Sequence, residues 1–357
     1  MNILKEKIHN IIIKSGPISI ASFMEISLSD KKYGYYRKKM PLGSKGDFVT
    51  SPDISQIFGE IIGIWILDIW IKLKKPSNFQ IVDLGGGRGT LLKDINRVLK
   101  NKVSKFIFID INEELIKLQK EALKDASHFE KIDDIPKITT IFIGNEFLDT
   151  FPVHQFIKKD NCWKEVCIDS NDNELFFSHK TTKLSKKLPS SNFLNLKEGS
   201  IIEINFKTRE IIKNISNFIR ENSGAAIFFD YGYIDGYGDS FQGIKNNKPI
   251  NPLSDPGFVD LTSHVNFKDI KLQAEEKDVN IYGPNTQSLF LKEMGAIQRL
   301  KILEKNANDH QKKDLRIGLN RLMGDNEMGS LFKVIALSSK NFPSLEGFTC
   351  GTTTIKE

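Results

Sequence analysis

Cysteine is scarce in this chain of 357 residues, which contains only Cys162, Cys167 and Cys350. Three cysteines are too few for a disulfide framework. Four residues separate the first two, but the further Cys or His ligands that a zinc site needs are missing from their neighbourhood. We therefore expect no metal centre.

Long hydrophobic runs are also missing. The most apolar stretch, residues 61–73, contains Asp68 and Lys72 and is shorter than the roughly 20 residues that cross a bilayer. The first 14 residues include charged side chains such as Glu6, and the first 20 contain no arginine, so neither a secretory signal nor a mitochondrial presequence is evident. These features predict no membrane span and a bacterial-type cytoplasmic location.

A strong net charge is absent as well. Lys and Arg number 51 against 45 Asp and Glu, and the resulting charge of +6 is spread along the chain. This balance gives no reason to expect a nucleic-acid partner. The oligomeric state is left open.

Two regions are expected, divided at the Pro76-Ser77-Asn78 break. Residues 1–75 form an N-terminal helical and loop segment, with helices over 3–14 and 19–26 and a long helix from Ser51 to Ile69. Residues 76–357 form the core, with insertions near 160–195 and 234–325.

The core predicts an α/β fold with a mostly parallel, doubly wound sheet, because short apolar strands alternate with helices. The predicted elements are strands at 79–84, 105–110 and 139–143 and helices at 90–99 and 113–123. Residues 163–168 and 174–177 indicate a β-hairpin inserted into the sheet order, after which strands at 200–204 and 225–229 resume the parallel pattern around a helix at 208–222. A long surface loop over 234–257, helical structure over 286–325 and a strand at 331–337 complete the prediction.

A glycine-rich turn follows the first core strand. Gly85, Gly87 and Gly89 alternate directly after that strand, and Thr90 begins the next helix. Glycines at such a turn let a ligand approach the backbone and the free amides of the helix N-terminus. We expect a nucleotide-like ligand here, although a structural tight turn would also explain the glycines.

An acidic residue, Asp110, ends the second core strand, where a ribose diol is held in dinucleotide-binding folds. A helix-capping role is the alternative. NAD enzymes share this arrangement, but Asp83, two residues before the first glycine, favours S-adenosylmethionine as the ligand.

The segment from Asn145 to Phe156 follows the next strand of the core, and loops at the carboxyl ends of parallel strands line the ligand crevice. It brings Glu146, Asp149 and His154 toward the predicted ligand. With this segment, the chain resembles the MidA-like methyltransferases, a family related to a mitochondrial complex I assembly factor that methylates a protein arginine. The matching segments cover nearly the whole chain: Gly34-Tyr35-Tyr36, Gly46-Asp47-Phe48-Val49-Thr50-Ser51-Pro52, Phe58-Gly59-Glu60, Gly87-Arg88-Gly89-Thr90-Leu91, Asn145-Glu146-Phe147 with Asp149, Pro152-Val153-His154-Gln155, Asp230-Tyr231-Gly232, Asp260-Leu261-Thr262 with His264-Val265, Gly283-Pro284 with Thr286-Gln287, and Met328-Gly329 with Leu331-Phe332-Lys333-Val334.

The resemblance implies a Rossmann-like class I methyltransferase that uses S-adenosylmethionine and methylates an arginine of a protein, such as a respiratory complex I subunit. Asp83, Gly86 and Asp110 differ from the residues expected in many relatives, but the two acids keep the chemistry.

Carboxylates suit an arginine acceptor, because they bind the guanidinium fork bidentately and can make one nitrogen more nucleophilic. The predicted catalytic residues are Glu146, Asp149 and Asp230, with turn formation or capping as the alternative for the two aspartates. The predicted cofactor-binding residues are Asp83, Gly85, Gly87, Gly89, Thr90, Asp110 and Asn145. His154 is expected to be structural.

Three alternatives stay open at this point. The chain could be an assembly chaperone that binds S-adenosylmethionine without turnover, or a methyltransferase for another acceptor. Methylation of a nucleic-acid base is disfavoured, because no Asn or Asp followed by Pro-Pro and an aromatic residue follows the fourth strand.

Overall fold

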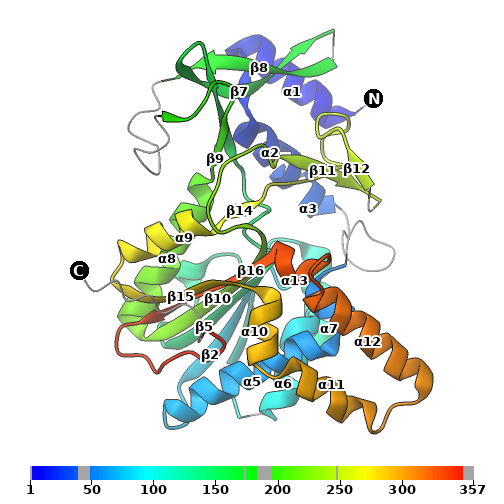
Figure 1. The fold of residues 1–357 in the computed structure, drawn as a ribbon. Helices are drawn as coiled ribbons and strands as arrows, with labels where there is room; N and C mark the ends of the chain where they lie inside the picture. Colours follow the sequence, from blue (N-terminus) through cyan, green and yellow to red (C-terminus); the bar gives the residue numbers. More distant parts are fainter. Residues whose placement is uncertain are drawn as a thin grey trace.

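The computed structural model describes residues 2–38, 49–100, 102–103, 105–172, 174–182, 195–246 and 248–348. A large α/β part carries a central sheet with helices on both faces. A second, smaller part contains two further sheets together with the first helices of the chain (Figure 1).

The central sheet has the order β15-β16-β10-β5-β2-β3-β4, and the short β14 (Val265–Asn266) pairs with β10. All neighbours in this order are parallel except β16, which runs antiparallel to both β10 and β15. The chain order reverses between β2 and β5, so the crevice of a doubly wound sheet is expected at their carboxyl ends. The bounds are β2 Phe79–Leu84, β3 Lys105–Ile109, β4 Ser127–Phe129, β5 Thr139–Asn145, β10 Gly224–Tyr233, β15 Val279–Thr286 and β16 Phe332–Ser339.

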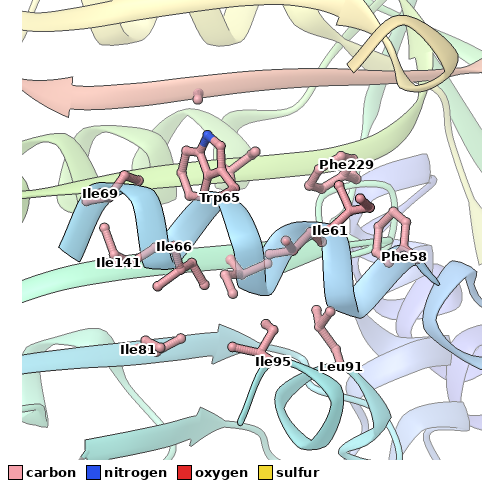
Figure 2. Packing of buried hydrophobic residues seen from close by; sticks show 14 of the residues in the cluster. Phe58, Ile61, Trp65, Ile66, Ile69, Ile81, Leu91, Ile95, Ile141 and Phe229 are labelled. Atoms are coloured by element: carbon pink, nitrogen blue, oxygen red, sulfur yellow. The ribbon is translucent and has the colours of Figure 1, made fainter. Parts of the chain in front are cut away.

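Helices that cover both faces of the sheet leave the middle strands almost completely buried: β2 is buried at every position, β5 at all but one and β10 at all but two. On one face, Trp65 and neighbouring isoleucines of α5 (Gln56–Lys72) pack against Ile81 of β2 and Ile141 of β5, with α6 (Thr90–Leu99) beside them (Figure 2). On the other face lie α8 (Phe206–Asn222) and α9 (Phe267–Glu275). The further helices of the large part are α7 (Glu113–Ala122), the 3₁₀ turn η1 (Ile132–Asp134), α10 (Gln287–Glu293), α11 (Ala296–Glu304), α12 (Asp309–Met323) and α13 (Met328–Leu331).

The smaller part has its own apolar core, in which α1 (Ile3–Ser15) and α2 (Ile20–Ser29) pack against a five-stranded sheet. This sheet contains β1 (Ile18–Ser19), β6 (His154–Lys159), β7 (Cys162–Asn171), β8 (Glu174–Thr181) and β9 (Ile201–Ile204). A three-stranded sheet of β11 (Gln242–Lys245), β12 (Lys248–Ile250) and β13 (Asp260–Thr262) lies beside it (Figure 1). The short α3 (Tyr35–Lys38) packs against α2, and the short α4 (Ser51–Ile54) packs against α5 and α12 of the large part.

The α/β fold class and the first core strands and helices are confirmed, but three expectations were wrong. The predicted hairpin forms as β7 and β8, yet it belongs to the second sheet and is not inserted into the central one. The strand predicted at 200–204 does not resume the parallel pattern, because β9 pairs antiparallel with β6. The segment 234–257 is no simple loop, since it contributes β11 and β12. Apolar patterning predicts that a segment is a strand but not which strand it will pair with.

Two predicted helical regions are interrupted. The helix expected from Ser51 to Ile69 divides at Ser55, whose backbone is extended (φ −155°) and whose hydroxyl accepts from the Ile57 amide at 3.3 Å. The region 286–325 divides into α10, α11 and α12, with Gly295 in the left-handed conformation (φ 87°) between the first two.

The division at residue 75 stays a prediction. In the structure, α5 lies N-terminal to this point but packs into the core of the central sheet.

Candidate active site at the carboxyl edge of the central sheet

A cavity of about 590 Å³ opens at the carboxyl ends of β2, β3 and β5, where the strand order reverses. Its size suits a small-molecule ligand. Seven of the predicted site residues line it: Asp83, Gly85, Gly87, Thr90, Asp110, Asn145 and Glu146. Gly89, Asp149 and Asp230 are not among the lining residues.

The glycine turn between β2 and α6 has the backbone that only glycine adopts readily. Gly85, Gly87 and Gly89 have φ values of 66°, 54° and 81°. A Cβ at Gly89 would lie 3.0 Å from the Cβ of Ala122, so this glycine allows the turn to pack against α7. Gly85 and Gly87 line the cavity, whereas Gly89 packs against α7 on the side of the turn away from the cavity.

Asp83 lies at the base of this turn. Its side chain is 2% exposed, and its Oδ2 atom has no hydrogen-bond partner among the described residues. Burial and the charge of Asp110 raise the pKa of Asp83 to about 8. A buried carboxylate without a partner beside a cavity fits a cationic or hydrogen-bond-donating group of a ligand.

Asp110 is held at the tip of β3 by two hydrogen bonds. Its Oδ1 accepts from the Asn112 amide at 2.9 Å, and its Oδ2 accepts from Gln119 Nε2 at 2.8 Å. Gln119 Nε2 also donates to the carbonyl of Gly87 at 2.9 Å. Each carboxylate oxygen keeps acceptor capacity for a ribose hydroxyl.

Sequence reasoning missed Gln119, whose side chain links the glycine turn to Asp110. It is fully buried on α7, four residues after the buried Leu115. A polar residue at a core-facing position of that helix was the available signal.

The turn after β5 carries Glu146, and its backbone amides are hydrogen-bonded to the Asp230 side chain of β10. The Oδ2 atom of Asp230 accepts from three successive amides, those of Phe147, Leu148 and Asp149, at 3.1, 2.8 and 3.3 Å. Glu146 itself has a left-handed backbone (φ 51°), and its amide donates to the carbonyl of Phe229 at 2.9 Å. In this geometry, Asp230 positions the turn that presents Glu146.

The carboxylate of Glu146 lines the cavity and accepts two hydrogen bonds at its Oε1. The donors are the Ser51 amide and Asn145 Nδ2, both at 3.2 Å. Burial and the charge of Asp149 raise the pKa of Glu146 to about 8, although these hydrogen bonds and the charge of Arg321 act in the opposite direction.

Asp149 lies behind the turn and is 4% exposed. Burial raises its pKa to about 6, and a hydrogen bond from the Tyr231 side chain acts against this shift. The carboxyl group therefore contributes to the charge around Glu146 from outside the cavity lining.

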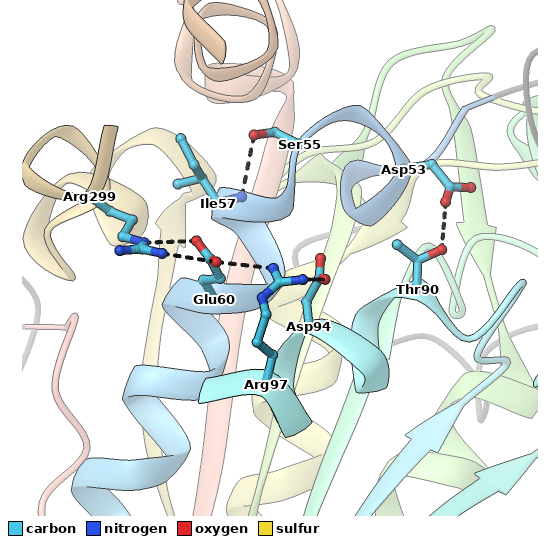
Figure 3. Close-up of polar contacts among 8 residues, drawn as sticks. All are labelled: Asp53, Ser55, Ile57, Glu60, Thr90, Asp94, Arg97 and Arg299. Atoms are coloured by element: carbon cyan, nitrogen blue, oxygen red, sulfur yellow. Dashed lines mark hydrogen bonds and ion pairs between the residues drawn. The ribbon is translucent and has the colours of Figure 1, made fainter. Parts of the chain in front are cut away.

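Tyr36 and Asp53 of the N-terminal segment also line the cavity. Sequence reasoning missed Asp53. The hydroxyl of Thr90 donates to Asp53 Oδ1 at 2.7 Å (Figure 3). The Tyr36 hydroxyl donates to Asp260 Oδ1 at 2.8 Å, and the backbone carbonyl of Tyr36 accepts from Asn112 Nδ2 at 2.6 Å. The motif residues 46–48 and the cysteine at 350 lie outside the described residues.

Acids dominate the cavity. Among the described lining residues, carboxylates outnumber Lys and Arg side chains by eight to three, although the whole chain carries a net charge of +6. Crowded and partly desolvated carboxylates stabilise a bound cation. The site is therefore electrostatically suited to cationic ligands.

A second group of charges is structural. Glu60 of α5 is 2% exposed and binds Arg97 of α6 at 3.0 Å and Arg299 of α11 at 2.8 Å, while Asp94 binds Arg97 at 3.0 Å (Figure 3). This network joins three helices on one face of the sheet.

No group of three or more His, Cys, Asp or Glu side chains in the described part of the chain is placed to hold a metal ion. Among the described residues, no helix has the length and apolar character required to span a membrane.

The doubly wound sheet, its glycine turn and the acid at the tip of β3 define a class of α/β protein that binds a nucleoside-containing ligand at the strand-order reversal. Comparison with known proteins identifies the family. Residues 61–285 match the family described as "Putative S-adenosyl-L-methionine-dependent methyltransferase". The chain belongs to this family, and its methyl donor is S-adenosylmethionine.

Two relatives show the extent of the similarity. The chain is 33% identical to the mitochondrial protein arginine methyltransferase NDUFAF7 of Danio rerio, over 91% of this chain and 84% of the relative. It is 34% identical to the protein of the same name from Homo sapiens, over 91% and 81%.

A crystal structure shares the fold. It is a protein from Burkholderia thailandensis bound to S-adenosyl-homocysteine, with a TM-score of 0.88, 22% identity and coverage of 98% of this chain and 95% of that chain.

Proposed function

We propose that this methyltransferase transfers the methyl group to an arginine side chain of a protein, with Glu146 as the residue that binds the guanidinium. The observation that carries the proposal is the Glu146 carboxylate, which faces a cavity where acids outnumber cations and has a raised pKa. The names of the relatives, which are protein arginine methyltransferases, support the same acceptor.

The proposed chemistry assigns a role to each predicted residue. Asp83, the glycine turn, Asp110 and Asn145 would hold the donor in the cavity that Glu146 also lines. Glu146 would bind the guanidinium and concentrate electron density on one of its nitrogens. S-adenosylmethionine would supply the methyl group: an N–C bond forms as the S–C bond breaks, S-adenosylhomocysteine is the leaving group, and one proton of the methylated nitrogen passes to solvent. Asp230 positions the Glu146 turn through its three amide contacts, and Asp149 adds negative charge behind it.

Ionisation of Glu146 is part of this proposal. A neutral carboxyl cannot bind a guanidinium bidentately. The pKa of about 8 is that of Glu146 before a cationic acceptor binds. An arriving guanidinium, which stays protonated at all ordinary pH values, lowers this pKa and favours the carboxylate.

The proposed partner is a protein substrate, and a respiratory complex I subunit is the particular candidate from the family resemblance. A bacterial cytoplasmic location is part of the same proposal. A chaperone that binds S-adenosylmethionine without turnover is the competing function, and it predicts that no labelled product forms.

The test uses the full chain with S-adenosylmethionine that carries a labelled methyl group, incubated with cell lysate. We expect a labelled protein band, and mass spectrometry of its peptides should locate the label on arginine. The Glu146→Gln variant should lose most of the label but keep its affinity for S-adenosylmethionine in calorimetry. The matched control is Glu114→Gln, which changes an exposed acid of α7 paired with Lys117 and should leave labelling unchanged. Label on another residue type would refute the arginine assignment, and absence of label with intact cofactor binding would favour the chaperone.

A further inference from the structure

The segment from Thr50 to Ile54 contacts both the turn after β5 and the first residue of α6, next to the glycine turn. On one side, the Ser51 amide donates to Glu146 Oε1 at 3.2 Å. On the other side, Asp53 Oδ1 accepts from the hydroxyl of Thr90 at 2.7 Å. Because Thr90 is the first residue of α6, the carboxylate of Asp53 lies beside the glycine turn, at the N-terminal end of that helix (Figure 3).

Asp83 supplies a second carboxylate at the same turn. It is the penultimate residue of β2, two residues before Gly85, whereas Asp53 reaches the turn from α4. Asp83 Oδ2 is buried without a partner among the described residues, and both acids line the cavity. Two carboxylates from separate elements thus lie at one glycine turn, and Asp53 Oδ2 has no hydrogen bond to any of the described residues.

The geometry of the rest of the cavity limits what this pair can bind. Asp110 lies at the tip of β3, where a ribose is bound in this class of fold, and Glu146 lies on the far side of β2, beyond β5. The remaining part of the donor is its amino-acid end, which carries an ammonium group and a carboxylate. An ammonium group has three N–H donors and is bound by carboxylates, whereas a carboxylate is bound by amides and guanidinium groups.

We propose that Asp53 binds the ammonium group of the donor's amino-acid end beside the glycine turn. The donor's carboxylate then lies toward Arg88 of the turn and the free amides at the start of α6. Thr90 is a positioning residue, because its hydroxyl fixes Asp53 Oδ1 and leaves Oδ2 for the ligand. The N-terminal segment therefore takes part directly in recognition of the donor.

The inference depends on the identity of the donor and not on the acceptor, so it can be tested without any substrate protein. Three ligands separate the contributions: S-adenosylmethionine, S-adenosylhomocysteine and methylthioadenosine. The first two carry the amino-acid end, and the third lacks it. S-adenosylhomocysteine also lacks the sulfonium charge, so general attraction by the acidic cavity does not account for its binding.

The main variant is Asp53→Asn, which keeps the size of the side chain and an oxygen for the Thr90 hydroxyl. We expect its affinity for S-adenosylmethionine and S-adenosylhomocysteine to fall about tenfold or more, the usual loss for a charge-assisted hydrogen bond. Its affinity for methylthioadenosine should stay within about twofold of the wild-type value. Thr90→Val should give a smaller loss with the same ligand dependence, because Asp53 remains but is less well oriented.

The measurement is isothermal titration calorimetry on the full chain, with thermal unfolding to show that each variant is folded. Equal losses for S-adenosylhomocysteine and methylthioadenosine would overturn the proposal, because Asp53 would then only support the turn. Unchanged affinity for S-adenosylhomocysteine would overturn it as well, and a raised KM for the acceptor in that variant would assign Asp53 to the acceptor side. If Asp53→Asn shows the expected pattern while no arginine product is found, the donor assignment stands and only the acceptor proposal fails.

Discussion

The pH dependence of methyl transfer offers a sharp test of Glu146, because its pKa is raised to about 8 in the cavity. If the carboxylate must be ionised to bind the acceptor, kcat/KM for the acceptor should rise with pH and level off above the pKa. With a pKa of 8, the ionised fraction is about 1% at pH 6 and about 90% at pH 9, so kcat/KM should increase roughly 90-fold over this range. A bound sulfonium lowers the pKa, so at saturating donor the midpoint lies below 8 and 90-fold is the upper bound of the increase.

The assay is initial-rate transfer of labelled methyl groups to an identified protein substrate at saturating S-adenosylmethionine. Saturation matters because the pKa of Asp83 is also raised to about 8, and its titration would otherwise affect donor binding. The Glu146→Gln variant should be slower by tens-fold or more and should lose the pH-dependent rise. A rise that persists in this variant, or a flat wild-type profile between pH 6 and pH 9, would refute the reasoning.

The same pKa shift has a consequence for stability. The folded-state pKa of Glu146 lies above its ordinary value of 4.5, because burial disfavours the charged form. Its contribution to stability is therefore fully present below about pH 4.5 and is lost as the pH rises through 8. The Glu146→Gln variant should gain in melting temperature relative to the wild type between pH 6 and pH 9, measured by circular dichroism without ligand. A constant difference across this range would contradict the assigned pKa.

Three further predictions follow from individual contacts. Asp110→Ala should weaken binding of S-adenosylmethionine by about 1 to 3 kcal/mol in calorimetry, because the ribose loses a charged acceptor, and unchanged affinity would place the diol elsewhere. Asp230→Asn should lower both the melting temperature and the rate of methyl transfer, because Asn has one acceptor oxygen in place of two, so that either the three amides of the turn or the Tyr231 amide loses its acceptor; loss of rate with full stability would instead give Asp230 a direct catalytic role. Glu60→Gln should cost about 2 to 3 kcal/mol of unfolding free energy in urea titrations, because two partly exposed guanidinium groups lose their buried partner, while donor affinity in the folded variant should be unchanged.

The sequence alone determined the class of fold and predicted a set of donor-binding residues, most of which line one cavity. Short apolar strands, glycines at alternate positions and the acid Asp110 follow one another within about 30 residues of chain, and their order along the chain already implies their arrangement. Because the carboxyl ends of parallel strands meet at one edge of a sheet, the sequence also predicts that Asn145 and Glu146 lie at the cavity.

Only the tertiary structure decided which side chains support and complete that site. Asp53 contacts Thr90 across 37 residues, Asp230 contacts the Phe147 amide across 83, and the Ser51 amide contacts Glu146 across 95. Such contacts form when separate elements pack together, and periodicity within one element contains no information about them. The same reason explains why β9 was predicted as part of the central sheet: its apolar pattern fits either sheet, and its pairing with β6 is a property of the packed chain.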